Sequence, residues 1–154
     1  MVTLSQSVMN TRRRQLLLAG AGGLALLPLG LWCNVSSTTR LFSACTDFNN
    51  QHYISALLDR GEVDFLIPIP ARAHDSVYLP ELGHAVFCSR RPGNALYVVD
   101  VKTKHLIATI NLPQHRYACG HGSANGRYLY TSEADAGSHQ GVIGVYDSTQ
   151  SYQR

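Results

Sequence analysis

Past Thr38 the chain alternates short runs of β-branched and aromatic residues with clusters of Gly, Pro, Asn and Asp. No stretch of it keeps the period of about 3.6 residues that an amphipathic helix needs, whereas short apolar runs between turn formers are typical of strands. The predicted strands are residues 41–45, 52–58, 63–69, 77–79, 85–89, 95–101, 106–112, 128–131 and 142–146. This pattern predicts an all-β fold.

Three segments share one pattern, in which an apolar strand is followed by a polar loop and by a second strand that ends in Asp. They are Leu41–Cys45 with Tyr53–Asp59, Ala85–Ser89 with Leu96–Asp100, and Tyr128–Ser132 with Ile143–Asp147. The closing aspartates are 41 and 47 residues apart. A repeat of about 40 to 50 residues with four short strands is typical of a β-propeller blade.

Blades of this kind stack around an axis because a single four-stranded sheet cannot bury both of its faces. The three segments make about two and a half blades, whereas a closed propeller has roughly four to eight. Residues 38–154 are therefore predicted to form an incomplete β-propeller of four-stranded antiparallel blades. The sequence stops at residues 151–154, where the outer strand of the third segment should begin, so we expect a chain truncated at its C-terminus.

Two residue types recur within the repeat. The closing aspartates are expected to cap the turns after their strands, because Asp side chains accept hydrogen bonds from the backbone of a turn. Cys45 and Cys88 occupy the same repeat position to within one residue, and both are expected to be buried as small apolar side chains. With Cys119 they make an odd number without CxxC spacing, which argues against a disulfide framework, a zinc ribbon or attached haem.

The first 37 residues have the pattern of an export signal. Three consecutive arginines precede an apolar run at residues 16–32, which Gly and Pro interrupt and which is too short for a typical membrane span. Arg13 and Arg14, followed by one polar residue and two leucines, resemble the twin-arginine signal. We therefore predict a signal helix in residues 1–37, the Tat export machinery as its partner, a periplasmic location and only transient membrane contact. Sec export and a retained signal anchor are the alternatives.

The net charge of +3 is accounted for by those three arginines. From Thr38 onward, ten Lys or Arg residues balance ten Asp or Glu residues. Binding of nucleic acid depends on a basic surface that neutralises phosphates. The neutral balance of the remaining chain therefore argues against nucleic acid as a partner.

Several stretches resemble a bacterial family of Tat-exported proteins, domain of unknown function 1513, which is related to seven-bladed quinoprotein-like and YVTN-type propellers. The matching stretches are Leu66–His74, Ser89–Gly93, Tyr117–Ser123, Asn125–Glu133 and Gly141–Asp147. The resemblance implies a periplasmic propeller with a surface for a ligand or a partner at its mouth. It implies no biochemical activity, because fold-level analogy does not establish function.

His74 and His121 are the strongest candidates for a binding site. They are 47 residues apart, within the spread of the repeat, and each lies between the outer strand of one repeat unit and the start of the next. Corresponding positions of successive blades recur around the axis, so both imidazoles are expected near the central channel, where they can bind a metal, an anion or a polar ligand. Arg72 and Glu133 are the candidate neighbours. The alternative is that both histidines only satisfy loop backbone groups.

No GxSxG, HExxH or Walker motif occurs in the chain, and Gly120 and Gly122 around His121 indicate a close backbone approach rather than a phosphate loop. One hypothesis is a propeller that binds a ligand or a protein partner without catalysis. A second is a metal- or quinone-dependent enzyme whose site Arg72, His74, His121 and Glu133 line. A third is a truncated gene product without function. The sequence leaves open whether the protein is an enzyme, and its cofactor and ligand are unknown.

Overall fold

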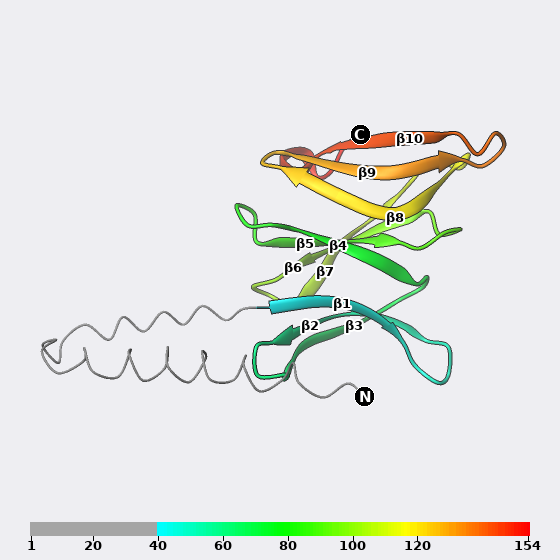
Figure 1. Cartoon of the computed structure of the whole chain (residues 1–154). Coiled ribbons are helices and arrows are strands. Elements are labelled where there is room, and N and C mark those ends of the chain that lie inside the picture. Colours follow the sequence, from blue (N-terminus) through cyan, green and yellow to red (C-terminus); the bar gives the residue numbers. More distant parts are fainter. Residues whose placement is uncertain (1–39) are drawn as a thin grey trace, which may run out of the picture. The chain divides into compact units, whose positions relative to one another are not determined.

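A computed structural model of the chain describes residues 40–154, and these residues are almost entirely strands and turns (Figure 1). The all-β prediction is therefore confirmed. The predicted export signal, with Arg13 and Arg14, lies outside the described residues. Within residues 40–154, no helix is long and apolar enough to cross a membrane.

The described residues form ten strands and one short 3-10 helix, η1, at Ser148–Gln150. The strands are β1 (Arg40–Thr46), β2 (His52–Leu58), β3 (Val63–Ile69), β4 (Ala73–Leu79), β5 (His84–Ser89), β6 (Ala95–Asp100), β7 (His105–Asn111), β8 (Arg116–Asn125), β9 (Tyr128–Asp135) and β10 (Gly141–Asp147).

Three small antiparallel sheets contain these strands. The first sheet is β1-β2-β3, the central sheet is β4-β5-β6-β7, and the third sheet is β8-β9-β10. Within each sheet, strands that are consecutive in the chain pair with each other, as short turns between antiparallel strands allow. The three segments that share the sequence pattern correspond to the strand pairs β1–β2, β5–β6 and β9–β10. No closed propeller is formed by residues 40–154.

The inner strands of the central sheet, β5 and β6, are buried on both faces, because this sheet lies between the other two sheets (Figure 1). Successive residues of a strand point to opposite faces. On β5, Ala85 and Phe87 therefore pack with the first sheet, whereas Val86 and Cys88 pack with the third. The unbroken run of apolar residues on β5 and β6 is the sequence pattern that this two-sided burial produces.

The predicted strands need two corrections. No strand was predicted between residues 112 and 128, where β8 lies, and β4 extends four residues further toward the N-terminus than the predicted strand at residues 77–79. Both segments contain a bulge, at which the register of pairing shifts. A bulge interrupts the alternation of apolar and polar residues. In β8 the glycines hide the strand further, since Gly weakens strand propensity.

The burial of Cys88 is confirmed, but the prediction for Cys45 is wrong, because Cys45 is exposed. In the first sheet Phe42 and Ala44 face the central sheet, and Cys45 points the other way. An offset of one residue in a strand moves a side chain to the opposite face. The approximate alignment of the two cysteines in the repeat was therefore insufficient to predict their burial.

The closing aspartates behave as turn caps in two of the three repeats. Asp100 accepts hydrogen bonds from the backbone nitrogens of Lys102 and Thr103, at 2.8 and 2.9 Å. Asp147 accepts one from the backbone nitrogen of Thr149 and caps η1. The outer strand of the third segment was expected to begin at residues 151–154. There Gln153 forms a single antiparallel bridge with Asp147 just after η1, and Tyr152 packs into the core between the central and third sheets.

Candidate binding site

His74 and His121 each lie in a β-bulge rather than in a loop before a strand. On β4, Ala73 pairs with Ser89 and Asp75 with Cys88, so His74 is the extra residue. On β8, Ala118 pairs with Glu133 and the next pair joins Gly122 to Thr131, so residues 119–121 face a single residue of β9. Bulges redirect side chains and are common beside functional sites. Here two bulges, in two different sheets, redirect the two candidate histidines.

The two imidazole rings are in contact. Their centroids are 5.2 Å apart and their planes are inclined by 75°, an edge-to-face arrangement. Gly120 makes this approach possible, because it has a φ of +90° and a Cβ at its position would lie 2.9 Å from Cδ2 of His74. The close backbone approach predicted from Gly120 and Gly122 is therefore present, and the partner of Gly120 is His74.

Asp75 adds a carboxylate to this pair. Its Oδ2 lies 3.7 Å from Nδ1 of His121 and accepts a hydrogen bond of 3.4 Å from the backbone nitrogen of Gly122. Solvent screens the attraction between these two side chains, because the His121 side chain is 67% exposed and that of Asp75 is 38% exposed. Sequence reasoning did not select Asp75. Asp75 and Gly122 are 47 residues apart, the same separation as the two histidines. This equal spacing is the sequence signal that could have identified Asp75.

Ser132 holds the backbone of the β8 bulge. Its hydroxyl accepts a hydrogen bond of 3.3 Å from the nitrogen of His121 and donates one of 3.1 Å to the oxygen of the same residue. A single side chain therefore satisfies both backbone groups of His121, and the imidazole is left exposed to solvent.

Among residues 40–154, no three His, Cys, Asp or Glu side chains are grouped so that they could hold a metal ion.

Glu133 occupies a different environment. Its carboxylate is buried and forms ion pairs with Arg154, at 2.7 Å, and with Arg116, at 3.5 Å. It also accepts hydrogen bonds of 2.6 Å from Tyr146 and 2.9 Å from Thr131. Burial, followed by the hydrogen bond to Glu133, raises the pKa of Tyr146. These partners belong to the third sheet and the chain end, so the structure does not group Glu133 with the histidines.

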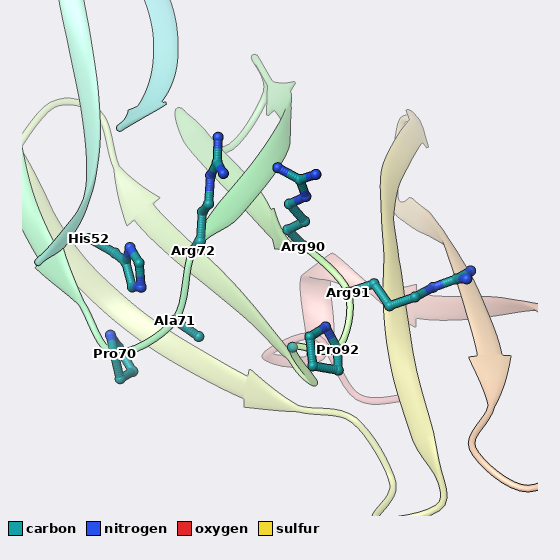
Figure 2. Close-up of a pocket in the computed structure, with 8 residues that line it drawn as sticks. His52, Pro70, Ala71, Arg72, Arg90, Arg91 and Pro92 are labelled. Carbon is teal, nitrogen blue, oxygen red and sulfur yellow. The ribbon is translucent and has the colours of Figure 1, made fainter. Parts of the chain in front are cut away.

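Arg72 lies just before β4 and lines an open cavity of about 650 Å³, which Figure 2 shows. The other lining residues are His52, Pro70, Ala71, Arg90, Arg91, Pro92 and Gly93. His74 and His121 are absent from this lining. Of the four predicted site residues, the structure therefore brings together the two histidines, and it places Arg72 and Glu133 at other positions. Their roles in binding stay predictions.

Comparison with known families gives one match. The sequence model of a family described as "Protein of unknown function (DUF1513)" matches residues 67–154, more than half of the chain. The matched part begins on β3 and includes both histidine bulges. No protein in the curated collection matches the chain.

Proposed function

Because this chain belongs to the DUF1513 family, whose function is unknown, we propose that it is an exported binding protein of the bacterial periplasm. In this proposal a β-propeller holds a polar ligand or a protein partner at His74 and His121 and performs no chemistry on it. The twin-arginine pattern at Arg13 and Arg14 supports export. The two-sided burial of β5 and β6 in the central sheet supports a propeller, because stacked blades bury both faces of each inner blade.

One observation carries the proposed site, namely the contact between the two imidazoles. His74 and His121 come from different sheets and from separate bulges, yet their rings are 5.2 Å apart and both are open to solvent. Within a strand, a bulge leaves one residue unpaired, which weakens the ladder locally. Two such interruptions that present neighbouring imidazoles are explained better by a ligand than by the stability of the sheets.

Binding is favoured over catalysis by the surroundings of the histidines. Both rings are exposed to water, and electrostatic stabilisation of a transition state depends on groups that are shielded from it. The chain also contains no GxSxG, HExxH or Walker motif.

The second candidate function is a metal- or quinone-dependent enzyme. The imidazole pair is the observation in its favour, since imidazole is the commonest metal ligand in proteins.

The test compares proteins purified from the periplasm under non-denaturing conditions. Native mass spectrometry and elemental analysis would be applied to the wild type, to a His74→Ala, His121→Ala double variant and to a His105→Ala control. His105 is exposed at the start of β7, so its loss should change nothing. The proposal expects a non-metal mass that the wild type and the control retain and that the double variant has lost.

The other outcomes separate the alternatives. A stoichiometric metal in the wild type that the double variant lacks would favour the enzyme. A bound mass that the double variant retains would show that the histidines are not the site. A wild type without any added mass would contradict a resident small ligand, and co-purification of a stoichiometric protein only with the wild type and the control would identify a partner instead.

A further inference from the structure

We propose that the cavity beside the starts of β2 and β4 binds a small organic anion through Arg72 and Arg90. This inference goes beyond the proposed function, because the cavity is lined by neither of the histidines of that site. It is also independent of whether a complete propeller forms.

The lining of the cavity is cationic. Arg72, Arg90 and Arg91 contribute guanidinium groups and His52 contributes an imidazole, whereas no Asp or Glu lines it. A guanidinium group remains protonated in proteins. The cavity therefore carries positive charge without any compensating carboxylate in its wall.

Two of these arginines have no ion-pair partner within residues 40–154. The arginines elsewhere that are paired, Arg40, Arg116, Arg127 and Arg154, each lie within 4.0 Å of a carboxylate. Arg91 is occupied differently, because it stacks over the ring of Tyr117 at 4.9 Å and donates a hydrogen bond to Sγ of Cys119. Arg72 and Arg90 are thus the guanidinium groups of the cavity that are free to take an anion.

The backbone holds these two arginines next to each other. The nitrogen of Arg90 donates a hydrogen bond of 2.8 Å to the oxygen of Arg72. Figure 2 shows both side chains extending in the same direction from these adjacent positions, while Arg91 points away. Two neighbouring cations repel each other, so an anion placed between them relieves the repulsion and gains attraction from both.

The turn after Arg90 is anchored on both sides. The nitrogen of Gly93 donates a hydrogen bond of 2.7 Å to the oxygen of Arg90, and the oxygen of Gly93 accepts one of 2.8 Å from the nitrogen of Ala118 on β8. A Cβ on Gly93 would lie 2.6 Å from Cβ of Ser89, so the turn packs closely against the end of β5. The site therefore has a preformed backbone, which lowers the entropic cost of binding.

The shape and the lining indicate the class of ligand. Guanidinium groups bind carboxylate and phosphate in a bidentate manner. Pro70, Ala71 and Pro92 give the same cavity an apolar part, and its volume of about 650 Å³ is within the range of small-molecule sites. His52 forms a hydrogen bond of 2.9 Å through Nδ1 with the hydroxyl of Thr46, which orients the ring. The ligand class is an organic molecule with a carboxylate or phosphate group and an apolar body.

The test is isothermal titration calorimetry of the purified full chain with phenyl phosphate and benzoate, and with inorganic phosphate and acetate as probes that lack the apolar body. The variants are Arg72→Gln and Arg90→Gln, with Arg60→Gln as the control. Arg60 is exposed in the turn between β2 and β3 and lies outside the cavity. We expect the wild type and the control to bind at least one aromatic anion with the same affinity. Each cavity variant should bind that anion at least about tenfold more weakly.

The Arg72→Lys variant distinguishes the effect of charge from that of bidentate hydrogen bonding, because lysine keeps the charge and loses the paired donors of the guanidinium group. Its affinity should lie between those of the wild type and Arg72→Gln. Comparison of phenyl phosphate with benzoate identifies the preferred anionic group. The proposal is overturned if neither aromatic anion binds the wild type, if the Gln variants bind like the control, or if inorganic phosphate and acetate bind as tightly as their aromatic counterparts. The His74→Ala, His121→Ala variant should keep this binding, so failure here and failure of the proposed function are distinguishable.

Discussion

Gly144 of β10 lies directly against the buried carboxylate of Glu133 on β9. A Cβ at position 144 would overlap Oε1 of Glu133 and would come within 2.6 Å of Oγ1 of Thr131. The carboxylate cannot move aside freely, because Arg154 and the hydroxyl of Tyr146 hold it at 2.7 and 2.6 Å. The glycine thus provides the space in which the buried polar cluster of the third sheet forms.

We therefore expect Gly144→Ala to lower the free energy of unfolding by about 1 to 3 kcal/mol, the usual cost of overpacking a filled site. Gly141→Ala is the matched control in the same strand, since a Cβ there would meet nothing within 4 Å. Urea unfolding followed by circular dichroism measures both. Equal stability of the two variants would show that the cluster around Glu133 can rearrange at no cost.

Asp64 on β3 predicts part of the pH dependence of stability. Lys104 and Arg40 each bind its carboxylate at 2.6 Å, and their hydrogen bonds lower the pKa of Asp64. Because the folded-state pKa lies below the unfolded value of about 3.9, the ionised carboxylate stabilises the fold above about pH 4. This contribution is lost as the pH falls from there toward the folded-state pKa.

The Asp64→Asn variant should be less stable than the wild type at pH 7, and the difference should shrink as the pH falls below about 4. Urea unfolding at several values between pH 7 and pH 3 would measure it. Glu62→Gln is the control, because Glu62 is exposed in the preceding turn. A difference that stays constant down to pH 3 would mean that packing of Asp64, and not its charge, is what the variant loses.

Cys88 and Cys45 should differ strongly in reactivity. Burial, and then the charge of Asp75, raises the pKa of Cys88 to about 12, so its reactive thiolate is scarce at pH 8. Cys45 is exposed. With N-ethylmaleimide at pH 8 and peptide mapping by mass spectrometry, Cys45 should be labelled rapidly and Cys88 only after denaturant is added. Labelling of both at one rate in the native protein would contradict the packing of the third sheet against the central one.

Export is predicted to depend on Arg13 and Arg14, since the twin-arginine pathway recognises that pair. An Arg13→Lys, Arg14→Lys double variant should accumulate in the cytoplasm, whereas the wild type and an Arg12→Lys control should reach the periplasm. Cell fractionation and immunoblotting give the distribution. Normal export of the double variant would favour the Sec pathway, and recovery of the wild type in the membrane fraction would favour a retained anchor.

Strands that are apolar runs between clear turn formers could be predicted from the sequence almost to the residue. The predicted ranges 52–58 and 63–69 coincide with β2 and β3. β8 was missed because its glycines and its bulge remove the apolar alternation on which such a prediction depends. The same bulges hid the geometry of the site, since a register shift between paired strands leaves no clear pattern in either strand alone.

The sequence by itself determined the all-β fold class, the positions of most turns and the repeat of its three segments. These features depend on side-chain patterns and turn chemistry that act over only a few residues. Only the tertiary structure decided which face Cys45 and Cys88 occupy, that Glu133 is held by arginines, and that Asp75 lies beside His121. The contact between His74 and His121 joins residues 47 positions apart in different sheets. It depends on two bulges and on the packing of one sheet against another, and interactions of that range are not encoded in any local pattern.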